Sequence, residues 1–137
     1  MNSTGNLELQ HLYKLNKLRL IELNGIDEEI LFFKELLETH FLNYLSDLEK
    51  DNGQFFSYRL SRVNHVKSLL TKEAIILQDN LASKIYNEEN KTCDLYQPEN
   101  DRLAEEVSVL TKTFNTLKEE IISMNEIASI KEPNSSI

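Results

Sequence analysis

The stretch that decides the fold is Ile26–Leu48, IDEEILFFKELLETHFLNYLSDL. It carries more apolar side chains than one face of a helix can hold, so it must pack against more than one neighbour. Apolar residues recur at seven-residue spacing through this stretch and upstream of it. One position of the repeat holds Leu9, Leu23, Ile30, Leu37 and Tyr44, and the position three further on holds Leu12, Ile26 and Phe33 and ends at His40. This spacing predicts a first long helix over about 6–50.

Gly25 lies inside this repeat and does not shift its phase. A helix interior tolerates one glycine at a cost of about 1 kcal/mol, so we expect the helix to continue through it. The alternative is a helix that ends near Leu23 and a second one that starts with Asp27 as its N-cap. That arrangement would give four helices in place of three.

Two further helices are predicted downstream. Asp51, Asn52 and Gly53 tolerate the left-handed conformation and predict a turn, followed by a helix over about 54–88. The repeat of that helix is Phe56, Leu60, Val63, Lys67, Leu70, Ala74, Leu77 and Leu81, in which Lys67 is the one polar residue. A third helix is predicted over about 98–131, because Pro98 suits a first turn and Leu103, Val107, Leu110, Phe114, Leu117, Ile121, Met124 and Ala128 follow at heptad spacing. The tail over 132–137 is expected to be disordered.

Charge favours the pairing of the first two helices. Residues 26–51 hold eight acidic side chains and two lysines, whereas residues 54–72 hold four basic side chains and no acidic one. A short turn would therefore fold an acidic helix onto a basic one. The sequence predicts an all-α fold, an antiparallel up-down-up bundle of three long helices with coiled-coil-like packing, in a single domain over 1–137.

Composition narrows the classes of partner. The formal net charge of −8 disfavours nucleic acid, whose phosphates would be repelled outside local basic patches. No apolar run approaches the roughly 18 residues of a membrane span, and the N-terminal residues resemble no signal peptide. Cys93 is the only cysteine, which fits a reducing compartment. We expect a cytoplasmic protein with no membrane span.

No catalytic, metal or nucleotide motif has a spacing that rises above chance. Glu8 and His11 form the only Glu-x-x-His match to a di-iron bundle, and we expect both to be solvated near the chain terminus. Cys93 lies in a polar segment that we expect to be an exposed loop. Lys91 would lower the pKa of the thiol and Asp94 would oppose that effect, so an ordinary loop thiol is predicted rather than a nucleophile.

A histidine pair is the sharper metal candidate. Across a hairpin centred on 52–53, His40 and His65 stand at similar heights, and Glu119 or Glu120 of the third helix could approach the same level. The repeat that places His40 inside points His65 outward, however. We therefore predict no metal ligand and no cofactor.

Two polar residues, Asn16 and Arg19, occupy positions of the apolar repeat. Polar residues at such positions fix the register of packed helices at some cost in stability, and neither suggests catalysis. The surrounding segment 11–19, HLYKLNKLR, is basic and amphipathic. Because its leucines are in phase with the repeat, we expect core packing rather than binding to a membrane surface.

The first helix also has apolar residues that the bundle does not use. Six of them should face away from the other two helices, namely Leu18, Ile21, Leu31, Phe32, Leu42 and Leu45. A row of this kind marks an association surface. We therefore predict a non-enzymatic protein–protein interaction or assembly module, a homodimer or an adaptor for a helical partner protein. The alternative is a bundle that binds a metal or small ligand near His40 and Tyr44.

Overall fold

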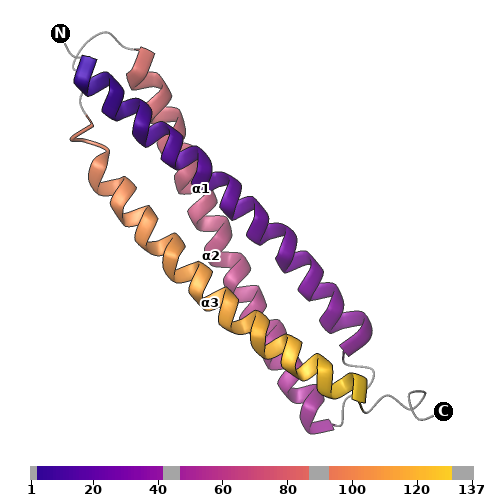
Figure 1. Ribbon diagram of the computed structural model, residues 1–137. Helices are drawn as coiled ribbons and strands as arrows, with labels where there is room; N and C mark the ends of the chain where they lie inside the picture. The colour runs from indigo at the N-terminus through magenta and orange to yellow at the C-terminus, as the bar shows by residue number, and fades with distance from the viewer. Residues whose placement is uncertain (1–2, 42–46, 87–92, 131–137) are drawn as a thin grey trace. The chain divides into compact units, whose positions relative to one another are not determined.

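The computed structural model describes residues 3–41, 47–86 and 93–130 of the chain. Helix α1 spans Ser3–Glu35 and continues as a π-helix, η1, over Leu36–Phe41. Helix α2 spans Asp47–Tyr86 and α3 spans Gln97–Ile130 (Figure 1). The three helices pack against one another, which confirms the predicted all-α antiparallel bundle of three helices.

Helix α1 is continuous through Gly25, as the unbroken phase of the repeat predicts. The four-helix alternative is therefore wrong. A Cβ placed on Gly25 would meet nothing within 4 Å, so no neighbour requires a glycine at this position. The cost of the glycine is only the intrinsic one, about 1 kcal/mol relative to alanine.

The predicted turn at 51–53 is wrong, because α2 begins at Asp47 and Asp51–Gly53 lie within it. The sequence Ser46-Asp47-Leu48-Glu49 has the spacing of a capping box, a strong signal for a helix start. The three residues of the predicted turn are only weak helix formers, and a helix with a buried face tolerates them. The charge argument for pairing the first two helices depended on this turn and no longer holds, because Asp47, Glu49 and Asp51 belong to α2 and not to the first helix.

By its internal contacts the chain divides into two compact units. Unit 1 comprises Met1–Gly25 and Lys67–Val109, and unit 2 comprises Ile26–Val66 and Leu110–Ile137. Each unit takes part of all three helices. The prediction of a single domain stays a prediction.

The core of unit 1 consists of repeat positions from α1, α2 and α3. Its buried apolar side chains are Leu9, Leu12, Leu23, Leu70, Ala74, Leu77, Leu81, Leu103 and Val107. Helix α3 begins after a turn in which the N–H groups of Tyr96 and Gln97 both donate to the Cys93 carbonyl at 2.9 Å. Pro98 lies in the first turn of α3, as predicted, where its missing N–H leaves no bond unmade.

The core of unit 2 likewise consists of repeat positions from all three helical segments. Its buried side chains are Ile26, Ile30, Phe33, Leu37, Phe56, Leu60, Val63, Leu110, Phe114, Leu117 and Ile121. The rings of Phe33 and Phe114 meet edge to face with centroids 6.3 Å apart. Lys118 of α3 pairs with Glu29 of α1 at 2.9 Å, and Arg59 of α2 pairs with Glu120 of α3 at 2.8 Å. These two pairs connect α3 to its neighbours.

Candidate functional site

The first candidate is a buried polar cluster in unit 1. Asn16 is fully buried, and its Nδ2 donates to the Ala74 carbonyl at 2.8 Å and to Gln78 Oε1 at 2.9 Å. Both acceptors belong to α2, so this amide holds α1 and α2 at one relative height. An apolar residue in its place would remove both hydrogen bonds between the two helices.

Arg19 extends the cluster to α3. Its Nη1 donates to Asn16 Oδ1 at 2.6 Å and its Nη2 donates to Asn100 Oδ1 at 2.9 Å. Burial lowers the pKa of Arg19 from its ordinary value, and the charge of Glu22 partly offsets that effect. These polar groups satisfy one another's hydrogen bonds, so the cluster is suited to fixing the register of the helices in unit 1. It offers little to a ligand.

Cys93 is the second candidate, and its predicted exposure is wrong. The residue is buried in unit 1, and its Sγ donates to Glu8 Oε2 at 3.0 Å. The hydrogen bond to Glu8, burial and the charges of Glu8 and Asp94 all raise the pKa of the thiol. A raised pKa keeps the sulfur protonated at neutral pH, which is the opposite of what a nucleophilic or metal-binding thiol needs.

The structure does not bring the proposed metal ligands together. Glu8 is engaged with Cys93, and His11 and His65 are both exposed. Glu120 is held by Arg59 through two hydrogen bonds, at 2.9 and 2.8 Å. Tyr44 and the side chain of His40 lie outside the described residues. Within the described residues, no three His, Cys, Asp or Glu side chains are grouped so that they could hold a metal ion.

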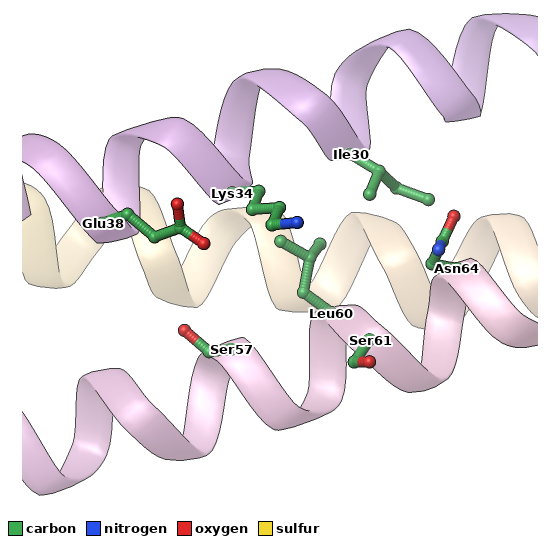
Figure 2. A pocket seen from close by; sticks show the side chains of 7 residues that line it. All are labelled: Ile30, Lys34, Glu38, Ser57, Leu60, Ser61 and Asn64. Carbon is green, nitrogen blue, oxygen red and sulfur yellow. The ribbon is translucent and has the colours of Figure 1, made fainter.

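The third candidate is a groove in unit 2 (Figure 2). The end of α1 and η1 form one of its walls, and the first half of α2 forms the other. Its volume is about 220 Å³. The lining side chains are Ile30, Lys34 and Glu38 from the first two elements and Ser57, Leu60, Ser61 and Asn64 from α2. Five of the seven are polar, and they come from both walls.

The predicted association surface is partly described. In unit 1, Leu18 and Ile21 are 62% and 61% exposed; in unit 2, Leu31 and Phe32 are 61% and 62% exposed. The remaining two residues, Leu42 and Leu45, lie outside the described residues. On α1 in unit 2, Glu28 and Glu35 lie one turn before and one turn after the apolar pair, and both are exposed. We call Glu28, Leu31, Phe32 and Glu35 the acidic face.

Comparison with protein-family models, with curated proteins and with solved structures gives no match. Function must therefore be argued from the surfaces of this chain alone. Among the described helices, none combines the length and the apolar sequence that a membrane crossing requires.

The sequence reasoning missed a second exposed face, on α2 of unit 2. Phe55 and Tyr58 are 56% and 58% exposed, and Val66 is 39% exposed. Arg62 and His65 are exposed between them. The guanidinium of Arg62 lies 6.0 Å from the centre of the Tyr58 ring, and its Nη1 donates to the Tyr58 hydroxyl at 3.4 Å. We call these five residues the basic face.

A signal for the basic face was present in the sequence. Its members recur at spacings of three and four residues, as the members of one helix face do. Each stands one or two positions away from the apolar repeat of α2, and so none of them enters the core. The same test that found the leftover apolar residues on the first helix would have found these.

Proposed function

We propose that this protein is a non-enzymatic interaction module that self-associates, with the acidic face of one copy lying on the basic face of another. The observation that supports this most is the exposure of Leu31 and Phe32, side by side on α1, between Glu28 and Glu35. An apolar centre with charged side chains at its rim is the usual composition of a protein interface. Cytoplasmic location stays a prediction from the sequence.

Charge complementarity identifies the occupant of the acidic face. The chain carries a net charge of −8, so two copies repel each other over most of their surfaces. The segment 54–72 is an exception, with four basic residues and no acidic one, and the basic face lies within it. A second copy therefore offers Arg62 to the glutamates and Phe55 and Tyr58 to the apolar centre.

The two faces lie in the same unit, which makes the contact reciprocal. When the acidic face of one copy covers the basic face of its partner, the partner's acidic face can cover the first copy's basic face. Such an arrangement closes a symmetric dimer. Burying a side chain such as Leu31 or Phe32 contributes about 1.5–3 kcal/mol, so a few such residues dominate the affinity.

Sedimentation equilibrium of the full chain tests this proposal. We expect a dimer at high micromolar concentration, and we expect Phe32→Asp to give a monomer because it places a charge in the apolar centre. Arg62→Glu should also weaken the dimer. Ile122→Asp is the matched control, since Ile122 is exposed on α3 outside both faces.

A charge swap makes the test specific for the two faces. The double variant Glu28→Lys with Glu35→Lys should be monomeric by itself and should dimerise again when Arg62→Glu is added. A wild-type chain that is monomeric at high micromolar concentration, or a Phe32→Asp variant that dimerises like wild type, would refute the proposal. Capture of a helical partner by the acidic face of a monomeric wild-type chain would support the adaptor alternative instead.

A further inference from the structure

Polar side chains line the groove of unit 2 from both walls, four of them exposed and Ser57 half-buried. Lys34 and Glu38 project into it from one wall, and Ser57, Ser61 and Asn64 project from the other (Figure 2). Within the part of the chain that the structure describes, none of these five side chains makes an ion pair or hydrogen bond to another residue. Polar groups that face one shared space without protein partners are available to a ligand.

Lys34 and Glu38 lie four residues apart, on either side of the change from α1 to η1. A lysine and a glutamate four residues apart on an α-helix normally approach each other. Here the two side chains form no ion pair, and the change from α1 to the π-helix η1 falls between them, after Glu35. Thr39 supports this transition by donating its Oγ1 to the Glu35 carbonyl at 2.7 Å.

The ends of the groove therefore differ in charge. The Lys34 ammonium lies toward its middle, and the Glu38 carboxylate faces Ser57 at one end (Figure 2). Ile30 and Leu60, both buried, form an apolar floor beneath them. Ser61 and Asn64 supply neutral donors and acceptors at the other end.

This arrangement selects the charge of the ligand. An inorganic anion that bound Lys34 would be repelled by Glu38, and a metal cation that bound Glu38 would be repelled by Lys34. A molecule that carries its own carboxylate and ammonium satisfies both at once through charge-assisted hydrogen bonds. The volume of about 220 Å³ is below that of a typical drug-sized pocket, so the ligand is small.

From these observations we propose that the groove binds a free α-amino acid with a polar side chain. Lys34 holds the carboxylate, Glu38 and Ser57 hold the ammonium group, and the carbon skeleton lies on Leu60. The side chain extends toward Ser61 and Asn64. This site shares no residue with the acidic or basic face, and it does not depend on self-association.

Titration of the full chain with L-glutamine, followed by calorimetry and by amide NMR shifts, tests the site. We expect a dissociation constant at or below about 1 mM and shifts centred on the amides of Ser57, Ser61 and Asn64. Lys34→Gln and Glu38→Gln should each weaken binding at least about tenfold, because each removes one charge-assisted contact. Lys112→Gln and Glu105→Gln, both exposed on α3, are the matched controls.

Two ligand analogues separate the proposed mode from non-specific association. Glutamine methyl ester lacks the carboxylate and N-acetylglutamine lacks the ammonium group, so both should bind at least about tenfold more weakly than L-glutamine. Equal binding of all three molecules, or no shifts at millimolar L-glutamine, would overturn the proposal. The monomeric Phe32→Asp variant should bind L-glutamine like wild type, so failure of the dimer and failure of the site are distinguishable.

Discussion

At the scale of single residues, Asn16 and Arg19 show how a core can contain polar groups without a ligand. Asn16 donates to two acceptors on α2 and accepts from Arg19, which in turn donates to Asn100 on α3. A sliding helix would break these bonds, whereas leucine against leucine is insensitive to a shift of one turn. The cluster therefore fixes the relative heights of the three helices in unit 1.

Asn16→Ala should lower the free energy of unfolding by about 2–3 kcal/mol. The substitution removes two hydrogen bonds to α2 and leaves an Arg19 N–H buried without its acceptor, and an unpaired buried donor costs more than a hydrogen bond contributes. Urea denaturation measures the loss. Asn24→Ala is the control, since Asn24 is exposed on the same helix, and it should change stability by less than about 0.5 kcal/mol. Equal effects of the two substitutions would contradict a register role for the cluster.

Cys93 should react slowly with a thiol reagent such as Ellman's reagent at pH 8. Its raised pKa keeps the thiolate fraction low, and burial restricts access. Glu8→Gln removes the carboxylate that raises the pKa most, so the reaction should become several-fold faster, whereas Glu105→Gln on the surface of α3 should leave the rate unchanged. A rate in wild type equal to that of the unfolded chain would show that the thiol is not held by Glu8.

At the scale of helices, Gly25→Ala should stabilise the protein by about 0.5–1 kcal/mol. Alanine has the higher helix propensity, and the added Cβ meets no neighbour within 4 Å. Thermal unfolding followed by circular dichroism measures the change. Asn24→Gly, at the exposed neighbouring position, is the reverse control and should be destabilising by less than about 1 kcal/mol. A destabilising Gly25→Ala would mean that a bend in α1 requires the glycine.

Helices are also the scale at which the sequence was most and least informative. The seven-residue phase identified the buried side of each helix. Repeat positions such as Leu37, Leu60 and Phe114 are buried, whereas Lys67 and Met124 are half-buried. Periodicity reports which side chains are interior, but it does not report where a helix starts. The residues Asp51–Gly53 read as a turn because each tolerates one, yet Ser46 and Glu49 form the capping pattern that coincides with the start of α2.

At the scale of the molecule, the candidate sites depended on features that a repeat does not encode. The exposure of Leu31 and Phe32 follows from the repeat alone, because neither residue occupies one of its positions. The groove does not follow from it, because the groove joins side chains of α1 and η1 with four side chains of α2, and the repeat does not specify this combination. Likewise, the bond between Glu8 and Cys93 joins residues 85 positions apart, and spacing in the sequence gives no sign of it.

Two ion pairs, one between α2 and α3 and one within α3, make stability depend on pH in a predictable direction. In unit 2 the Arg59 guanidinium lowers the pKa of Glu120, and in unit 1 Arg102 lowers the pKa of Glu99, from an ordinary value of 4.5. A carboxylate whose pKa is lower in the folded state stabilises the fold, and this stabilisation is fully present above about pH 4.5. It is lost as the pH falls through the lower folded-state value, because both states are then protonated.

Arg59→Gln should therefore reduce the free energy of unfolding more at pH 7 than at pH 2. The loss at pH 7 should be below about 1 kcal/mol, because the side chains of Arg59 and Glu120 remain 26% and 43% exposed and water screens the pair. Urea denaturation at both pH values gives the two differences. Glu119→Gln is the control, because it removes the charge of an exposed neighbour of Glu120 and leaves the pair of Arg59 with Glu120 in place. The ring centres of Phe55 and Phe56 lie 5.5 and 5.8 Å from the Arg59 guanidinium. If the loss of stability for Arg59→Gln were the same at pH 7 and pH 2, it would come from packing against these rings and not from the pair with Glu120.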